Sequence, residues 1–385
     1  MNIGIFTETF LPNIDGVVVS ILNMNKLLVD RGHKISVFTA GGGPEEVDGC
    51  RVFRTKGLGL PSYKGYKLGI PSLKIMNQLV KGGADIIHSR GPFTIGLMAK
   101  HMSKIMKLPI IGTFDTPIQD YLHYLPVAGK FKTSKDALTK IAIKYSMWYY
   151  NRCDLVTAPS VTIKKDLEKM GCKKRIEVLS NGVDINRFSP ENYSEELRSK
   201  LCSNDERMIF HVGRITKEKG VDVLLKAARA LKLEGLRFKL VIGGKGPVLD
   251  DLKAMSRNLG ISDSVVFAGF ISDEDLPKYY ATADVFATAS IVETQGIVML
   301  EAMASGTPVV GAQAGAIPEL VRDDINGFVF KPTDHKQAAE KLINVIGNES
   351  LRKELSSGAI KSVRDHSLEK VCDKVESIYN ELTNS

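Results

Sequence analysis

The sequence predicts an α/β protein made of two doubly wound, Rossmann-like domains that face each other across a cleft. Three observations support this prediction. Short apolar runs alternate with amphipathic helical patterns along the chain, which is typical of parallel sheets with helices on both faces. The alternation pauses near residue 190 and restarts after residue 205. The length of 385 residues also favours more than one domain, because a domain has about 150 residues.

In the first half, each apolar run ends in a polar loop that leads toward a helical pattern. Asp15 precedes the first of these helices and can cap it with its carboxylate. The expected strands are Ile3–Thr7, Lys34–Thr39, Ile86–His88, Ile110–Gly112 and Leu155–Ala158, and the expected helices are Val18–Arg31 and Thr94–Met106.

The second half repeats the same alternation after the polar stretch Ser189–Asp205, which is the predicted linker zone. We therefore expect domains at residues 1–188 and 189–365. The expected strands are Met208–Val212, Phe238–Ile242, Val265–Phe267, Val285–Ala287 and Pro308–Gly311, and the expected helices are Val221–Leu233, Leu249–Leu259, Asp275–Ala281 and Ile297–Ala304.

The composition excludes several classes of protein. Hydrophobic residues make up 43% and charged residues 25% of the chain, which is ordinary for a globular protein and excludes a mainly disordered chain. The five cysteines are scattered without a CxxC pair, so neither a disulfide framework nor a zinc ribbon is indicated. We expect a cytoplasmic protein without a signal peptide or a transmembrane helix.

The positive charge is concentrated in the first half. Residues 1–185 carry 26 Lys and Arg against 15 Asp and Glu, whereas residues 186–385 carry 26 against 29. Residues 49–84 contain seven basic residues and no acidic one, and a second basic stretch at 130–152 is interleaved with aromatic residues. Such a half can bind an anionic membrane or nucleic acid, or it can be a solvated basic face.

The densest motif runs from Ser290 to Pro308 and contains two glutamates, Glu293 and Glu301. Gly296 precedes an apolar helical run and allows a ligand to approach the backbone closely. The amides from Gln295 onward would then lie at a helix N-terminus, where an anion such as a diphosphate binds. Glu293 can accept hydrogen bonds from sugar hydroxyls, and Glu301 from a vicinal diol such as that of a ribose.

A second motif follows the expected strand Met208–Val212. It reads Gly213-Arg214-Ile-Thr-Lys-Glu-Lys219-Gly220 and places two cations at the carboxyl end of a strand. Arg214 can bind two oxygens of a diphosphate and Lys219 can act as a point charge, so both can stabilise a departing nucleoside diphosphate. The glycines from Gly243 onward follow the next strand and could also approach phosphates.

Taken together, these motifs resemble the family 4 glycosyltransferases. Glu293 to Glu301 matches the EX7E signature of that family, and Gly213 to Gly220 matches its donor-phosphate loop. The segments Ser180-Asn-Gly-Val-Asp184 with Phe188-Ser-Pro190, and Ala312-Gln-Ala-Gly315-Ala-Ile-Pro318-Glu319, fit as well. The resemblance spans nearly the whole chain. It implies the GT-B architecture, a nucleotide sugar linked to UDP or GDP, retention of the anomeric configuration, and neither a metal nor another cofactor.

The resemblance also implies roles for single residues. Arg214 and Lys219 would hold the diphosphate, Glu301 the ribose, and Glu293 the transferred sugar. The remaining expected donor contacts are Gly16 in the loop after the first strand, Gly213, Gly243, Thr294, Gln295, Gly296 and Ile297. Members of the family usually end in a helix that returns to the first domain, so we expect residues 366–385, with a helix at Leu368–Leu382, to pack there.

A narrower resemblance lies between Gly112 and Leu125, where Asp120-Tyr121-Leu-His123-Tyr124 is similar to a stretch in glycolipid-forming members of the family. Those members usually carry an active-site histidine at the position of Asp115. An aspartate there could orient a sugar hydroxyl or stabilise positive charge in the transition state. The expected acceptor contacts are His88, Arg90, Asp120, Tyr121 and His123. For His88, a packed structural histidine is the alternative.

We therefore predict a glycosyltransferase that moves a hexose from a nucleotide sugar to a membrane lipid. Its acceptor domain is the basic half of the chain, which favours a peripheral position on the inner face of the cell membrane. Two alternatives stay open: the same transfer to a soluble acceptor, such as a sugar phosphate, an inositol phosphate or an oligosaccharide, and a nucleotide-sugar-binding protein without transferase activity. Nucleic acid is not an expected partner, because no nucleic-acid motif is present.

Overall fold

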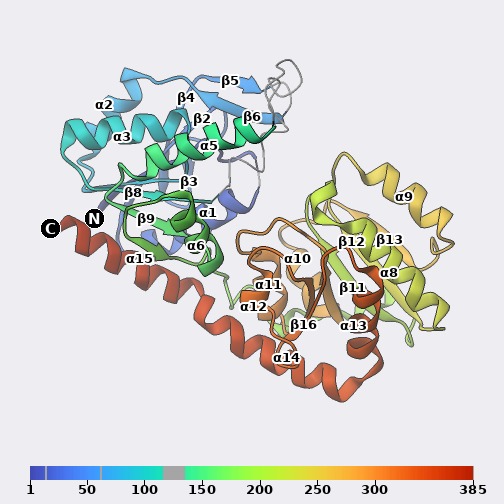
Figure 1. Ribbon diagram of the computed structural model, residues 1–385. Helices are drawn as coiled ribbons and strands as arrows, with labels where there is room; N and C mark the ends of the chain where they lie inside the picture. Colours follow the sequence, from blue (N-terminus) through green and yellow to red (C-terminus); the bar gives the residue numbers. More distant parts are fainter. Residues whose placement is uncertain (14, 61–62, 116–134, 385) are drawn as a thin grey trace. The chain divides into compact units, whose positions relative to one another are not determined.

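The computed structural model describes residues 1–13, 15–60, 63–115 and 135–384 (Figure 1). The chain divides into two compact units. The first unit comprises Met1–Asn181 together with Leu368–Ser385, and the second comprises Gly182–Ser367. The boundary between Asn181 and Gly182 therefore lies before the predicted boundary at residue 188. The boundary between Ser367 and Leu368 lies close to the predicted one at residue 365.

The first unit is built on an eight-stranded sheet with the order β10-β9-β8-β7-β1-β2-β4-β3. Its strands pair in parallel except β3, which pairs antiparallel with β4. The strands are β1 (Asn2–Phe6), β2 (Lys34–Ala40), β3 (Glu46–Val47), β4 (Cys50–Thr55), β7 (Ile86–Ser89), β8 (Ile110–Thr113), β9 (Leu155–Ala158) and β10 (Ile176–Val178). A separate hairpin joins β5 (Gly57–Leu60) and β6 (Tyr63–Gly69).

Helices cover both faces of this sheet, as the alternating pattern predicts. Strand residues of alternating direction, such as Ile86 and Ile87, belong to two different apolar clusters, one on each face. The helices on one face are α1 (Gly16–Asp30) and α15 (Leu368–Thr383), and those on the other are α2 (Leu73–Gly82), α3 (Thr94–Met106), α5 (Lys135–Tyr150) and α6 (Val161–Met170).

The C-terminal helix α15 belongs to the first unit and packs against α1 (Figure 1). Its apolar side chains join the cluster under α1. Glu376 accepts from Arg31 Nη1 at 2.6 Å and contacts His33 Nε2 at 2.7 Å. These contacts attach the end of the chain to a sheet whose strands come from its first half.

The second unit contains a six-stranded parallel sheet with the order β13-β12-β11-β14-β15-β16. Its strands are β11 (Arg207–Val212), β12 (Phe238–Gly243), β13 (Val265–Gly269), β14 (Val285–Thr288), β15 (Val309–Ala312) and β16 (Gly327–Phe330). The helices α8 (Val221–Leu233), α9 (Leu249–Asn258) and α13 (His335–Gly347) cover one face, and α10 (Leu276–Thr282), α11 (Ile297–Ala304) and α12 (Ile317–Leu320) cover the other. The longer α14 (Glu349–Val363) contributes to both clusters.

The predicted linker at Ser189–Asp205 is wrong, because this stretch is part of the second unit. It forms the short 3-10 helix η3 (Pro190–Asn192) and helix α7 (Glu195–Leu201). Ser194 caps α7 by accepting from the amide of Leu197, and both elements pack against α10. The polarity of the stretch reflects exposed helix faces, not a connection between domains. Two further 3-10 helices are η4 (Lys217–Lys219) and η5 (Arg364–His366).

In the described ranges, no helix combines the length and the apolar character that crossing a bilayer requires.

Each sheet reverses its strand order at one place, between β1 and β7 in the first unit and between β11 and β14 in the second. At such a place the loops at the carboxyl ends of the two strands diverge, and ligands of doubly wound sheets bind there. These two edges are therefore the expected ligand-binding regions of the two sheets.

Candidate functional site

In the second unit, the loops after β11 and β14 are joined by an ion pair. Lys219 Nζ lies 2.6 Å from a carboxylate oxygen of Glu293. Both side chains are partly exposed, at 24% and 12%. The backbone joins the same loops, because the amide of Ile291 donates to the carbonyl of Glu218 at 3.0 Å. Two residues that are 74 positions apart are thus brought together at the reversal of strand order.

Gly220 and Gly244 allow these loops to pack closely. Gly220 has a φ of 63°, and a Cβ there would lie 2.4 Å from the carbonyl oxygen of Ala289. Gly244 follows β12 with a φ of 120°, and its Cβ would lie 1.9 Å from the carbonyl oxygen of Gly213. A side chain at Gly220 would push apart the loops after β11 and β14, and one at Gly244 would push apart the loops after β11 and β12. The glycines of both motifs therefore shape the backbone around the site.

The start of α11 is held in place by two glycines. Gly296 occupies the N-cap position with a φ of 91°, and Ile297 begins the helix. A Cβ on Gly315 would lie 2.4 Å from the carbonyl oxygen of Glu293, which accepts from the amide of Ala316 at 3.0 Å. Since the backbone of Glu293 is fixed in this way, its carboxylate is presented beside the helix N-terminus. Two residues connect Glu293 to the N-cap of this helix in the sequence. Of these, Thr294 is partly exposed and Gln295 is buried.

Glu301 lies one turn into α11 and is buried, with 7% of its surface exposed. The hydroxyl of Tyr280 donates to its carboxylate at 2.8 Å. Burial raises the pKa of Glu301 to about 7, although the Tyr280 bond and the charge of Arg187 lower it. Its carboxyl group is therefore half ionised near neutral pH and becomes a stronger acceptor as the pH rises.

Arg214 is exposed and follows the end of β11, and Gly243 ends the neighbouring β12. With Lys219, two cations therefore line the carboxyl edge of the sheet, next to the N-terminus of α11. A diphosphate carries the charge that such a set of donors stabilises. Arg214, Lys219, Glu293 and Gly296 thus follow the carboxyl ends of β11 and β14, whereas Glu301 lies inside α11.

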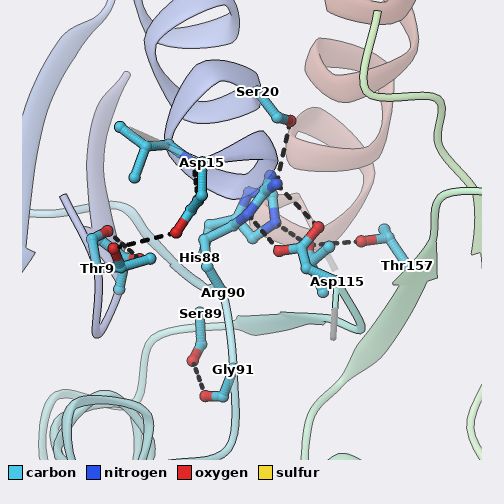
Figure 2. Close-up of polar contacts among 12 residues, drawn as sticks. Thr9, Asp15, Ser20, His88, Ser89, Arg90, Gly91, Asp115 and Thr157 are labelled. Carbon is cyan, nitrogen blue, oxygen red and sulfur yellow. Dashed lines mark hydrogen bonds and ion pairs between the residues drawn. The ribbon is translucent and has the colours of Figure 1, made fainter. Parts of the chain in front are cut away.

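In the first unit, Arg90 and Asp115 form a buried bidentate ion pair (Figure 2). Arg90 Nε donates to one carboxylate oxygen at 2.8 Å, and Nη2 donates to the other at 3.0 Å. Nη2 also donates to the hydroxyl of Ser20 at 3.1 Å. The side chains are only 3% and 5% exposed. Burial raises the pKa of Asp115, and the charge of Arg90 opposes that rise.

This pairing changes the expected role of Asp115. The sequence predicted a carboxylate that orients a sugar hydroxyl, whereas both carboxylate oxygens bind Arg90 in this structure. Arg90, a predicted acceptor contact, makes two hydrogen bonds to Asp115 and a third to Ser20. The geometry favours a pair that braces the loops after β7 and β8, and a direct contact of either residue with a substrate stays a prediction.

The contacts of His88 favour the alternative of a packed structural histidine. The residue is 1% exposed. Its Nδ1 lies 2.7 Å from the hydroxyl of Tyr379 on α15, and its Nε2 lies 2.5 Å from the hydroxyl of Thr113. Burial lowers the pKa of His88 to about 3, so the ring is neutral at physiological pH. The predicted acceptor contact therefore finds no support in these interactions, because both ring nitrogens already face protein hydroxyls.

The loop after β1 contains Asp15, which caps α1 as predicted by accepting from the amide of Val18 at 3.0 Å. The hydroxyl of Thr9 lies 3.4 Å from its other carboxylate oxygen (Figure 2). Gly16 is exposed at the first position of α1. The structure describes Gly16 within the first unit, and its predicted donor contact stays a prediction.

Glu8 in the same loop was missed by the sequence analysis. Its carboxylate accepts from the amide of Ile95 at 2.5 Å and from the hydroxyl of Thr94 at 3.2 Å, at the start of α3. The amide of Gly69 donates to it at 3.3 Å, and burial raises its pKa to about 7. The sequence offered only one indication of this role, an acidic residue just after the first strand. The partners of Glu8 lie more than 60 positions away, so no local pattern predicts them. The predicted acceptor residues Asp120, Tyr121 and His123 lie outside the described residues.

Two family models match the chain, and together they cover most of it. The model described as Glycosyltransferase Family 4 matches residues 14–187, and the model described as Glycosyl transferases group 1 matches residues 193–362.

Several curated proteins are similar to this chain over most of its length. The alpha-monoglucosyldiacylglycerol synthase of Streptococcus pneumoniae is 31% identical over 86% of this chain and 75% of the relative. The enzyme of the same name from Acholeplasma laidlawii is 28% identical over 99% of this chain and 97% of the relative. The GDP-mannose-dependent alpha-mannosyltransferase of Corynebacterium glutamicum is 26% identical over 99% of this chain and 89% of the relative.

Solved structures share the fold at lower identity. The Anabaena HepE protein, in a complex with UDP-glucose, has a TM-score of 0.81 and 21% identity, covering 99% of this chain and 100% of that protein. The sucrose-phosphate synthase of Thermosynechococcus elongatus has a TM-score of 0.79 and 18% identity, covering 100% and 99%.

We predict that Asp115→Ala destabilises the first unit strongly, because it leaves the Arg90 guanidinium buried without its counter-charge. Removing one partner of a buried pair costs about 3–5 kcal/mol. The chain has one tryptophan, Trp148, and it lies in the first unit. Urea unfolding followed by tryptophan fluorescence therefore reports on this unit.

The double variant Arg90→Leu/Asp115→Leu should recover most of the lost free energy of unfolding, because no unpaired charge remains buried. Asp166→Ala, which removes the exposed partner of Lys169, is the control and should leave the unfolding curve nearly unchanged. An Asp115→Ala variant as stable as this control would contradict a structural role for the buried pair.

Proposed function

Because the chain belongs to the family 4 glycosyltransferases, we propose that it transfers a hexose from a nucleotide diphosphate sugar to a membrane lipid, with retention of the anomeric configuration. The predicted GT-B fold and the predicted glycosyltransferase activity are confirmed by these similarities. The lipid acceptor, the membrane location and the retention of configuration are parts of the proposal.

The observation that carries the donor half of the proposal is the Lys219–Glu293 pair beside the start of α11. Lys219 and Arg214 provide positive charge for the diphosphate, and the amides at Gly296 and Ile297 provide hydrogen-bond donors at a helix N-terminus. These groups stabilise the nucleoside diphosphate as it leaves. Glu293, fixed through its backbone, accepts hydrogen bonds from hydroxyls of the transferred sugar.

The acceptor half of the proposal rests on the relatives and on an exposed face of α5. Two relatives named above are synthases of monoglucosyldiacylglycerol by their names. On α5, the side chains of Lys140, Ile141, Lys144 and Trp148 are all exposed. Their spacing of three and four positions places them on one side of the helix.

This group of four side chains, the α5 stripe, combines two cations with two large apolar groups. Ile141 is 61% exposed and Trp148 is 41% exposed, while the Nζ of Lys100 lies 4.2 Å from the centre of the Trp148 ring. Exposed aromatic and aliphatic groups among lysines suit the boundary between headgroups and acyl chains of an anionic leaflet. The stripe supports docking of the first unit on the inner face of the cell membrane.

A transfer assay tests the proposal directly. Purified protein is incubated with UDP- and GDP-linked hexoses and with anionic vesicles that contain diacylglycerol, and the glycolipid product and its anomeric configuration are determined. We expect a hexosyl lipid with the configuration of the donor. Product formed only on a soluble sugar phosphate or oligosaccharide would favour the soluble-acceptor alternative, and donor binding without transfer would favour a binding protein.

Glu293→Gln should lower the transfer rate by about 100-fold or more, since the carboxylate acts where charge develops in the transition state. The Glu340→Gln variant changes an exposed glutamate on α13 and should transfer like the parent protein. Circular dichroism checks that both variants are folded. A Glu293→Gln enzyme with near-normal turnover would remove this residue from the reaction.

The affinity for the nucleotide sugar should fall as the pH drops below 7, because hydroxyl donors need the ionised form of Glu301. With a pKa of about 7, ionisation decreases about fivefold between pH 7 and pH 6. Titration calorimetry with the intact nucleotide sugar, whose diphosphate keeps its charge in this range, should show that change. Glu301→Gln should bind more weakly and without this pH dependence. An unchanged pH profile in the variant would contradict the assignment.

Changing Lys140 and Lys144 together to glutamine should weaken binding to phosphatidylglycerol vesicles by roughly 30-fold, at about 1 kcal/mol for each lysine near the surface. The matched control changes Lys331 and Lys336, two exposed lysines of the second unit. Co-sedimentation at low and at high salt measures both variants. If the two variants lose equal affinity, or neither loses any, the α5 stripe is not the docking surface.

A further inference from the structure

A polar cavity of about 550 Å³ lies in the second unit, at the amino ends of the strands. Arg207 is the first residue of β11, Asp284 precedes β14, and Pro308 precedes β15. The donor motifs follow the carboxyl ends of the same strands. Since β11 has six residues and a strand rises about 3.3 Å per residue, roughly 20 Å of sheet separates the cavity from that site.

Four cationic side chains and two carboxylates line the cavity. The cations are Arg198, Arg207, Arg352 and Lys353, and the carboxylates are Glu195 and Asp284. They come from helix α7, strand β11, helix α14 and the turn before β14. Helix α14 packs against α11 (Figure 1). The lining therefore carries an excess of positive charge.

The carboxylate of Asp284 is shared by three guanidinium groups. Arg198 Nη1 lies 2.8 Å from one carboxylate oxygen, and Arg352 Nη1 and Arg207 Nη1 lie 2.8 Å and 3.5 Å from the other. The amide of Met208 also donates to Asp284, at 2.7 Å. Asp284 alone contacts all three guanidinium groups, and the charge of Glu349 also acts on Arg352. One shared carboxylate does not fully offset the repulsion among three arginines at short range.

Arg352 shows the consequence of this crowding. Its Nη1 atom is buried and forms an ion pair with Asp284, yet it makes no hydrogen bond of suitable geometry within the part of the chain that the structure describes. Burial lowers the pKa of Arg352, the charges of Asp284 and Glu349 oppose that shift, and the charges of Arg207 and Arg198 add to it. A second anion in the cavity would offset this repulsion and supply acceptors to the guanidinium groups.

We propose that this cavity is a second anion site that binds a phosphate ester or a diphosphate. Planar guanidinium groups favour the tetrahedral oxygens of phosphate through paired hydrogen bonds. The cavity lies within the range of about 300–1,000 Å³ that small-molecule sites occupy, so the phosphate can carry an organic group. That chemistry comes either from a soluble phosphorylated compound or from a lipid headgroup. The site is separate from the proposed donor site.

Calorimetric titration with inorganic pyrophosphate tests the proposal in the full chain carrying Arg214→Ala, which weakens the donor site. We expect one equivalent of pyrophosphate to bind to this protein at low salt. Adding Arg352→Gln should weaken that binding tenfold or more. Lys353 is 73% exposed and pairs with Glu349 at 2.8 Å, so Lys353→Gln should keep its fold and weaken pyrophosphate binding to a smaller extent. Arg257→Gln, an exposed arginine on α9, is the matched control.

The result that would overturn the proposal is pyrophosphate binding that is absent, or that is equal in the Arg257→Gln, Arg352→Gln and Lys353→Gln variants. Failure of the donor proposal would be recognised separately, because Arg214→Ala would then leave nucleotide-sugar binding unchanged.

Two further arms identify the source of the phosphate. Glycerol 3-phosphate represents soluble esters, and phosphatidylglycerol vesicles, compared with phosphatidylcholine vesicles, represent headgroups. Binding that depends on Arg352 in the first arm supports a soluble ligand, and in the second arm a lipid. If binding depends on Arg352 in neither arm, the site accepts the diphosphate but neither a soluble ester nor a lipid headgroup.

Discussion

The parallel pairing of β1 with β7 and of β11 with β14 is the constraint on which both candidate sites depend. In each sheet the strand order reverses at this pair, so the loops at the carboxyl ends diverge and leave their backbone groups available to a ligand. The ion pair of Lys219 with Glu293 and that of Arg90 with Asp115 both lie at such an edge. Their positions follow from the topology before any side-chain chemistry is considered.

The two ion pairs nevertheless differ in what they can do. Lys219 and Glu293 remain partly exposed, so each can exchange its partner for a charged or hydroxyl group of a ligand at moderate cost. Arg90 and Asp115 are almost fully buried and bidentate, and separating them would leave a charge in a medium of low dielectric constant. The first pair can therefore rearrange around a ligand, as the proposed function requires, and the second suits the positioning of loops. A resemblance in sequence position alone could not distinguish these roles.

The sequence predicts the structure correctly where neighbouring residues decide it. The helices Thr94–Met106, Val221–Leu233 and Ile297–Ala304 have their predicted bounds, because an apolar periodicity and a cap or glycine lie within one stretch. The prediction missed the strands β3 to β6, in which charged residues or glycines interrupt the apolar side chains. It also misread Ser189–Asp205 as a linker, since the packing of α7 on α10 depends on residues about 80 positions away.

By itself, the sequence determined the family, the alternating α/β architecture and the glycine-bounded motifs of the second half, because each of these depends on residues close together along the chain. Only the tertiary structure decided three contacts. Asp115 forms an ion pair with Arg90, His88 contacts Tyr379, which lies 291 positions later in the sequence, and three arginines converge on Asp284. The physical reason is the same in each case. Burial and charge pairing are set by side chains that folding brings together from distant segments, and no local pattern records those partners.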